Sequence, residues 1–418
     1  MTASQFSALF VAALLSNAVI KLWLAYRQLD HVAANRAEVP LAFREQINIA
    51  AHHKAADYTS TLVRFGGITV LFDTFLLLVF TLGGGIQWLS DASAGLTESL
   101  LLQGVVVIVL VLLLQSILEM PFDLYRTFNI EARFGFNKMT LKLYLLDAVK
   151  GTLLGAVLGL PLLFAVLWMM SAMGDLWWLY VWGVWVTFNL LLLFIYPTYI
   201  APMFNKFEPL QDEAQKLRIE SLLARCGFES SGLFVMDGSK RSSHGNAYFT
   251  GFGKTKRIVF YDTLLQRLSP SEIDAVLAHE LGHFKHRHVI KRIAFTFAVS
   301  LGFLWVLAQL LHAEWFYLGM GVTTQSTAIA LLLFFIALPV FTFLLHPLTS
   351  AYSRKHEFEA DAYAAQQTDA NELVNALVKL YQDNAKTLTP DPLYATFYES
   401  HPPAPIRIAH LQKLGAAK

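Results

Sequence analysis

The sequence predicts a mainly α-helical, polytopic membrane protein with about seven transmembrane helices and one long polar region. Of its 418 residues, 55% are hydrophobic and only 15% are charged, a composition typical of a chain that lies largely in lipid. Apolar stretches of roughly 20 residues are long enough to cross a bilayer as helices. Seven such stretches run over approximately residues 6–26, 67–89, 100–118, 151–173, 177–200, 289–311 and 327–348.

Two features of the apolar stretches need interpretation. The first stretch lacks the basic start and the small-residue cleavage site of a signal peptide, so we expect a retained span. Asp73 lies inside the second stretch, and a carboxylate that faces lipid is costly. We therefore expect Asp73 to face other helices or water, either in an ordinary interhelical hydrogen bond or in substrate handling.

The distribution of Lys and Arg predicts the orientation in the membrane. Basic residues crowd segments 27–64, 126–150 and 202–292 and the C-terminal tail, whereas the connections near 90–99, 174–176 and 312–326 have none. Basic loops remain in the cytoplasm. The N-terminus is therefore expected outside, with the polar region and the C-terminus in the cytoplasm.

A candidate metal site lies in the polar region at His279-Glu280-Leu281-Gly282-His283. Residues four apart on a helix share one face, so His279 and His283 direct both imidazoles toward one point. Two His ligands with an adjacent Glu as general base are the arrangement of zinc proteases. Ser269-Pro270-Ser271-Glu272 upstream is a helix start signal with a capping box, which places the motif on a helix.

A third ligand is expected, because catalytic zinc usually has three protein ligands and a water molecule. No Gly or Pro occurs between Thr349 and Leu388, so this segment is predicted to be helical. Glu357 can bind the ion, while Asp361 on the same face accepts the free ring N–H of a ligand His. His356 and Glu359 lie on other faces and are weaker ligand candidates.

These motifs resemble the integral-membrane zinc peptidases of the CAAX prenyl protease 1 family. The likeness covers most of the chain. Besides the motif at His279–His283, the segments that carry it are Ser353-Arg354-x-x-Glu357-x-x-Ala360-Asp361, Pro121-Phe122 through Phe134-Gly135-Phe136-Asn137-Lys138, Asp237 through Phe249, and Ser400-His401-Pro402-Pro403 with Arg407. The resemblance implies helices around a water-filled chamber, a peptide held by Asn246, Ala247 and Tyr248, and an oxyanion stabilised by His401 and Arg407. The sibling family of heat-shock membrane endopeptidases is shorter and has fewer spans.

The polar region is expected to contain two short helices and a small sheet. Residues 233–236, 247–252 and 257–261 are rich in β-branched and aromatic residues and are separated by Gly-bearing turns. An edge strand of such a sheet can hold an extended peptide across the metal. On composition alone, residues 239–246 are equally well explained as a solvated turn.

The expected organisation is one integrated unit, because no Pro, Gly or Ser-rich linker interrupts the chain. It comprises transmembrane helices 1–5 with cytoplasmic loops (1–201), the zincin-like region with the zinc helix (202–288), helices 6–7 (289–348) and a C-terminal region with the third ligand (349–418).

Other titratable residues receive structural interpretations. His286 and His288 are expected to rotate away from the metal and to mark the membrane boundary, and His244 to lie at the surface. The single Cys226 excludes an intrachain disulfide. A net charge of +1 and the lack of a basic–aromatic patch argue against nucleic acid as a partner.

The sequence therefore predicts a membrane-embedded metalloendopeptidase with one Zn²⁺ per chain, acting on peptides near the cytoplasmic face. The resemblance implies removal of the C-terminal tripeptide from CAAX peptides that carry a prenylated Cys, with membrane lipids as further partners. The compact loops suggest a bacterial inner-membrane protein. Alternatives are a quality-control endopeptidase for membrane proteins and a non-catalytic membrane scaffold or chaperone.

Overall fold

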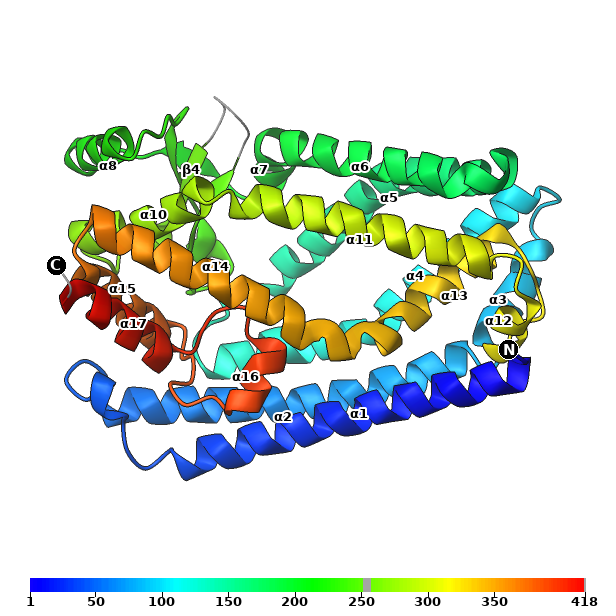
Figure 1. The fold of residues 1–418 in the computed structure, drawn as a ribbon, viewed down its shortest axis with the longest axis horizontal. Helices are drawn as coiled ribbons and strands as arrows, with labels where there is room; N and C mark the ends of the chain where they lie inside the picture. Colours follow the sequence, from blue (N-terminus) through cyan, green and yellow to red (C-terminus); the bar gives the residue numbers. More distant parts are fainter. Residues whose placement is uncertain (251–256, 417–418) are drawn as a thin grey trace.

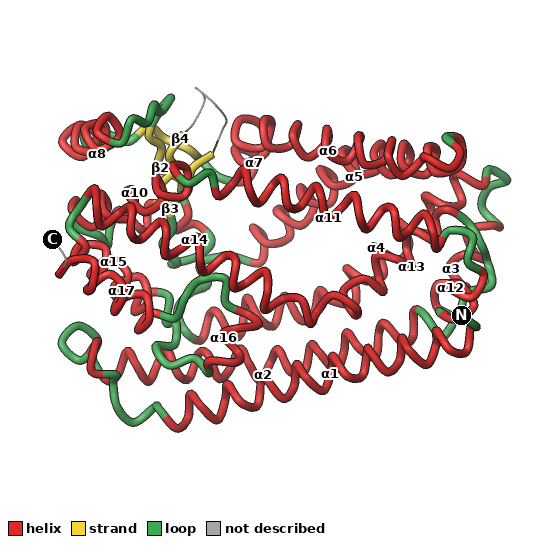
Figure 2. The backbone as a smooth tube through the Cα atoms, in the orientation of Figure 1, coloured by secondary structure: helices red, strands yellow, loops and turns green. Residues whose placement is uncertain are grey.

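The computed structural model describes residues 1–250 and 257–416, and the helices dominate it (Figures 1 and 2). The molecule is elongated, with the small sheet and the C-terminus at one end of its long axis and the N-terminus toward the other (Figure 1). Helices α1 and α2 run side by side along one flank, and α6 and α11 along the opposite flank (Figure 1).

Within the described residues, seven helical segments are long and apolar enough to cross a membrane, which confirms the predicted number. They are α1 (Ala3–Ala34), α2 (Ile49–Phe80), α4 (Leu100–Tyr125) with the π-turn Arg126–Glu131, α5 (Leu141–Ala172), α6 (Trp177–Ile195) with flanking turns and α7 (Ala201–Phe204), α11 (His288–Leu310), and α13 (Thr327–Thr342) continuing into α14 (His346–Gln367).

The second predicted stretch is displaced along the chain. Residues 67–89 cross the break between α2, which ends at Phe80, and the short helix α3 (Gly85–Ala94). Gly84 has a φ of 78° at this break, a left-handed conformation that glycine adopts without a Cβ clash. The span therefore begins far earlier than its apolar centre suggests, at Ile49.

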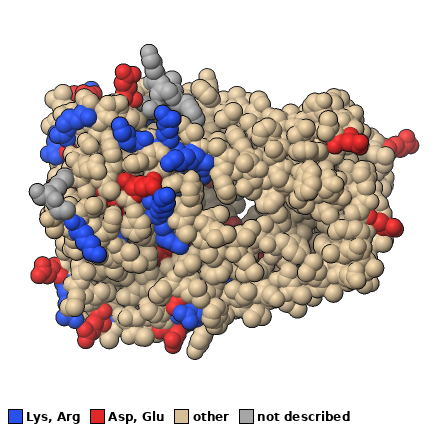
Figure 3. Space-filling view, in the orientation of Figure 1, with Lys and Arg blue, Asp and Glu red and all other residues tan. Residues whose placement is uncertain are grey.

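A cavity of about 470 Å³ lies between α1, α2, α4 and α13. Separately, the surface drawn in Figure 3 is hollowed near its middle. The lining of the cavity is mostly apolar, but Lys21, Asp73 and Glu119 also line it. Asp73 thus faces an internal space next to other polar groups, as the cost of a lipid-facing carboxylate requires.

The last membrane segment carries the chain directly into the polar region. Helix α13 passes through the single turn Phe343–Leu345 into α14, giving a continuous helical segment of 41 residues. This length is about twice what a bilayer needs, so its second half projects beyond the apolar part. The helix predicted to continue to Leu388 instead breaks at Thr368, because Asp369 caps the start of a new helix by accepting a hydrogen bond from the Asn371 backbone N–H.

The polar region contains a mixed sheet of four strands, counted over residues 1–250 and 257–416. The strands are β1 (Phe207–Pro209), β2 (Leu233–Met236), β3 (Ala247–Thr250) and β4 (Arg257–Tyr261), in the order β1-β2-β4-β3. β2 and β4 are parallel, and the other two pairs are antiparallel. Of the predicted strand 247–252, residues 251 and 252 lie outside the described residues.

The remaining helices pack around this sheet and at the opposite end of the molecule. They are α8 (Glu213–Arg225), α9 (Asp262–Leu265), α10 (Pro270–Lys285), α12 (Glu314–Gly319), α15 (Ala370–Asp383), α16 (Pro392–Tyr398) and α17 (Ala404–Ala416). Buried side chains of the sheet, α10, α15 and α17 form one hydrophobic core, represented by Phe260, Leu277, Leu373 and Ile408. This core holds α10 and α14 in a defined relative position.

Candidate metal centre

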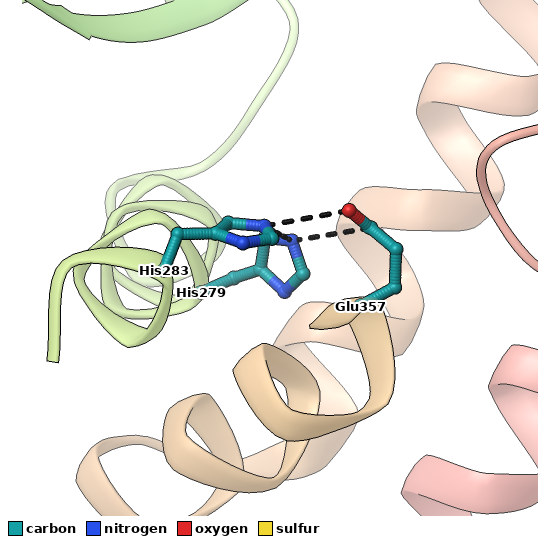
Figure 4. A group of neighbouring side chains, drawn as sticks. All are labelled: His279, His283 and Glu357. Atoms are coloured by element: carbon teal, nitrogen blue, oxygen red, sulfur yellow. Dashed lines mark hydrogen bonds and ion pairs between the residues drawn. The ribbon is translucent and has the colours of Figure 1, made fainter. Parts of the chain in front are cut away.

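Helix α10 begins where the sequence predicts. The Ser269 side chain accepts a hydrogen bond from the Glu272 N–H, and the Glu272 carboxylate accepts one from the Ser269 N–H. This capping box satisfies two backbone N–H groups at the helix start. From there α10 runs without interruption to Lys285 and places His279 and His283 one above the other on the side facing α14 (Figure 4).

Glu357 approaches these two rings from α14 (Figure 4). The Nε2 atoms of His279 and His283 are 3.3 Å apart, and the Glu357 carboxylate oxygens lie 3.5 Å and 3.4 Å from them. Three vertices of a tetrahedron around zinc, with bonds of about 2.0–2.1 Å, are separated by about 3.3–3.4 Å. The Glu357 Oε2 atom is buried and has no hydrogen-bond partner. The three side chains therefore fit a single ion in number, spacing and chemistry.

Asp361 lies directly beside the first candidate ligand, His279. Its carboxylate is fully buried and lies 2.9 Å from Nδ1 of His279. A proton on Nδ1 leaves the Nε2 lone pair free for the metal. Burial and the Arg407 charge act against a proton on His279, but the hydrogen bonds to Asp361 and Glu357 outweigh them and raise the pKa of His279 to about 9.

Arg407 is buried behind the ligands. Its guanidinium donates two hydrogen bonds of 2.7 Å to the carboxylate of Asp361, and its Nη1 lies 3.4 Å from Glu357 Oε2. The sequence-based expectation gave Arg407 a role only in oxyanion stabilisation. The structure shows a different interaction: Arg407 compensates the charge of Asp361, which would otherwise be buried without a cationic partner. Its part in oxyanion stabilisation stays a prediction.

Glu280 is partly exposed next to His279. Among the described residues its carboxylate has no hydrogen-bond or ion-pair partner. An uncommitted carboxylate beside a metal site suits a general base. His401 approaches from the loop before α17, with its Nε2 atom 3.7 Å from Glu357 Oε1. Burial lowers the pKa of His401 despite the opposing effect of Glu357.

Comparisons with known proteins agree with this geometry. Residues 28–206 match the family described as CAAX prenyl protease N-terminal, five membrane helices, and residues 209–415 match peptidase family M48. The chain is 38% identical over 361 residues to a CAAX prenyl protease 1 homolog of Oryza sativa, with 84% of each chain covered. The chain belongs to the CAAX prenyl protease 1 family. By family it is a zinc metalloendopeptidase and an integral membrane protein.

Two further comparisons extend over almost the whole chain. The Caenorhabditis elegans homolog is 33% identical, with 98% of this chain and 99% of the relative covered. A crystal structure of S. mikatae Ste24p superposes with a TM-score of 0.91 at 30% identity, covering 97% of this chain and 99% of that one. The relatives named here are eukaryotic, so they give no support to the bacterial source expected from the loops.

The segment expected to hold the substrate lies at an edge of the sheet. Among the strands of the described residues, β3 lies at the sheet edge and pairs with β4 alone, with Ala247 opposite Phe260 and Tyr248 opposite Val259. Asn246 precedes the strand and is exposed, and its carbonyl accepts a hydrogen bond from the Tyr261 N–H. The other long edge of β3 is therefore the one available for a further strand.

Two of the sequence-based expectations about histidines are wrong. His244 is not an isolated surface residue, because it stacks on Phe136 and lies 3.8 Å from the Glu131 carboxylate. His288 does not rotate away from the metal site, because it is fully buried with its Nδ1 atom 2.9 Å from Nδ1 of His283. Helix periodicity could not reveal this contact, because α10 ends before His288 and Arg287 adopts a left-handed conformation with a φ of 56° between the two helices.

Proposed function

We propose that this chain holds one Zn²⁺ between His279, His283 and Glu357 and removes the C-terminal tripeptide from prenylated CAAX peptides near the cytoplasmic face. The observation that carries the proposal is the convergence of three ligand side chains. The Nε2 atoms of His279 and His283 lie 3.3 Å apart, and each lies 3.4–3.5 Å from one oxygen of the Glu357 carboxylate, with the Glu280 carboxylate next to them in the chain. A non-catalytic scaffold has no need for this combination. The partners are a peptide with a lipidated C-terminal Cys and the surrounding membrane lipids.

Each residue of the site is proposed to have a separate role in peptide hydrolysis. A bound zinc ion supplies an acidified water molecule and polarises the scissile carbonyl. Glu280 would act as the general base: it would take a proton from the attacking water as the C–O bond forms and give it to the leaving amine as the C–N bond breaks. His401 and Arg407 stand near Glu357 and are proposed to stabilise the oxyanion of the tetrahedral intermediate. Asp361 keeps His279 in the tautomer that binds the ion.

The peptide is proposed to extend β3 as an additional strand. Backbone groups of Asn246, Ala247 and Tyr248 would then pair with the substrate. A prenyl chain needs an apolar space in addition, and the cavity between α1, α2, α4 and α13 is lined mainly by apolar side chains. Burial of each methylene-sized unit contributes about 0.8 kcal/mol, so the lipid is expected to add binding free energy beyond that of the peptide.

The metal centre is proposed to face the cytoplasm. In the view of Figure 3 all visible Lys and Arg gather over the end that carries the sheet, and the opposite end shows only acidic charges. Basic residues near membrane spans remain in the cytoplasm. Cysteine tags placed near Ser93 or Thr323, at exposed positions, are expected to react with impermeant reagents on intact cells, and tags near Glu213 are not. The reverse labelling would put the active site outside.

The decisive experiment compares purified wild type with Glu280→Gln. The variant keeps the shape of the side chain and removes the base, so we expect it to retain about one zinc per chain and to lose cleavage by roughly 10²–10⁴-fold. A chelator should inactivate the wild type reversibly. Full activity of Glu280→Gln would contradict the mechanism, and zinc-loaded wild type that cleaves no peptide would support the scaffold alternative.

A second comparison tests the substrate. The same CAAX peptide is supplied with and without a farnesyl group on its Cys, and kcat/KM is measured for both. A clear preference for the farnesylated form is expected, because remote binding of the lipid can stabilise the transition state. Equal values would favour a general endopeptidase that acts in membrane-protein quality control.

A further inference from the structure

His283 differs from His279 in what it contacts behind the metal. The Nδ1 atom of His279 meets the carboxylate of Asp361 at 2.9 Å. The Nδ1 atom of His283 instead meets another imidazole, Nδ1 of His288, also at 2.9 Å. His288 in turn places its Nε2 atom 2.8 Å from the carboxylate of Glu359. The three side chains form a continuous line from the metal position to a carboxylate.

When the site holds a metal, only one placement of protons allows both hydrogen bonds, from His283 to His288 and from His288 to Glu359, to form. The Nε2 atom of His283 points at Nε2 of His279 and at Glu357, so it must offer its lone pair to the ion. Its proton then resides on Nδ1. The neighbouring Nδ1 of His288 must accept that proton's hydrogen bond, and the remaining proton of His288 sits on Nε2, where the Glu359 carboxylate accepts it.

We propose that His288 and Glu359 are positioning residues that hold His283 in its metal-binding tautomer and orientation. This inference rests on the proposed zinc function and extends it. His279 is oriented directly by a carboxylate, whereas His283 is oriented by a carboxylate acting through a second histidine. Such partners of ligand side chains commonly change metal affinity by about 10–100-fold when they are removed.

The local backbone explains how a residue outside the zinc helix reaches this position. Helix α10 ends at Lys285, and Arg287 adopts a left-handed conformation with a φ of 56°. Non-glycine residues seldom adopt this conformation. The chain therefore turns sharply, and His288 begins α11 with its fully buried side chain directed back toward the end of α10.

A second metal site made by His288, His356 and Glu359 is the competing explanation, because their ligand atoms lie within 4.8 Å of one another. The geometry favours the hydrogen-bonded line. The rings of His288 and His356 are stacked, with centroids 3.9 Å apart and planes 9° from parallel. Imidazole nitrogens bind metals through lone pairs in the ring plane, and nearly parallel planes do not converge on one ion. Both nitrogens of His288 already have partners.

Two substitutions of His288 separate orientation from packing. His288→Phe keeps a ring against His356 but removes the acceptor for His283. His288→Asn loses the ring but places a carbonyl oxygen close to where Nδ1 stands, so the acceptor is retained. If His288 is a positioning residue, the Phe variant should bind zinc about 10–100-fold more weakly, as measured by competition with a chelator. The Asn variant should retain most of the affinity.

His356→Phe is the matched control, because it changes the stacked neighbour and leaves the line from His283 to Glu359 intact. It should bind zinc like the wild type and keep a stoichiometry of one. Unchanged zinc affinity in His288→Phe, or an equal or greater loss in His288→Asn, would overturn the proposal in favour of a packing role. Two zinc ions in the wild type, one of them lost in His356→Phe, would overturn it in favour of a second metal site.

The same measurements distinguish failure of this inference from failure of the proposed function. Wild-type protein that binds no zinc would contradict both. Wild-type protein that binds one zinc and cleaves peptide, together with a fully zinc-competent His288→Phe, would contradict only the role of His288 and Glu359.

Discussion

Gly282, inside the zinc motif, is predicted to set the distance between the helices that carry the ligands. A Cβ at this position would lie 2.8 Å from Ala360 Cα, 3.0 Å from the Ala360 carbonyl oxygen and 3.1 Å from Tyr363 Cβ, whereas ordinary contact begins at 3.4 Å. These atoms cannot rotate away, because they belong to the α14 backbone and to a Cβ. Gly282→Ala must therefore separate α10 from α14 by about 0.6 Å, as overpacked cores do.

This displacement is large for a metal site. Metal–ligand distances are expected within about 0.2 Å of their preferred values, and Glu357 lies on the helix that would move. We expect Gly282→Ala to lower the zinc affinity by at least roughly tenfold and to destabilise the protein by about 1–3 kcal/mol. Zinc affinity is measured by chelator competition, and stability by thermal unfolding with and without zinc.

Gly302→Ala on α11 is the matched control, because a Cβ there would meet no atom within 4 Å. It should leave zinc affinity unchanged. Gly282→Ala with the zinc affinity and kcat/KM of the wild type would refute the argument that close contact between the two helices holds Glu357 in place.

Asp361→Asn removes the carboxylate that pairs with the buried guanidinium of Arg407, so the free energy of unfolding should fall by about 3–5 kcal/mol. The same variant removes the partner of His279 and should weaken zinc binding about 10–100-fold. Asp57→Asn, which breaks an exposed ion pair, is the control, and its unfolding temperature should stay close to that of the wild type. Equal unfolding temperatures in the two variants would contradict a stabilising role of the buried Asp361–Arg407 pair. A pH effect is expected at His244, because the contact with Glu131 raises its pKa. Its stabilising contribution is complete below the unfolded-state value of about 6.5 and declines as pH rises through the higher folded-state value. The difference in thermal stability between wild type and His244→Gln should therefore be larger at pH 6 than at pH 9, and a constant difference would contradict this explanation.

The parts of the protein that could be predicted from sequence depend on short-range geometry. His279 and His283 share a face because they are four residues apart on one helix, and the capping box at Ser269 marks where that helix starts. The seven spans follow from the length of apolar stretches. The boundaries were less accurate, as at α2, because helical turns with polar and charged side chains extend beyond the apolar centre on which the prediction relies.

Contacts between distant segments were decided by the tertiary structure. Glu357 could be proposed as a ligand from its helical pattern and the family resemblance, but its spacing of 3.4–3.5 Å from the two His nitrogens depends on how closely Gly282 lets α10 approach α14. The salt bridge between Arg407 and Asp361 likewise joins two helices that no periodicity connects.

His288 is the clearest case of what the chain's pattern alone could not provide. Helical periodicity counted from His279 predicted that His288 points away from the metal. This prediction failed because the periodicity applies only within one helix, and α10 ends before His288. One left-handed residue, Arg287, ends that continuity and returns the side chain to His283. Local sequence therefore determined the elements and the ligand types, and the packing of α10, α11 and α14 determined which side chains meet, because distances between helices depend on contacts summed over the whole core.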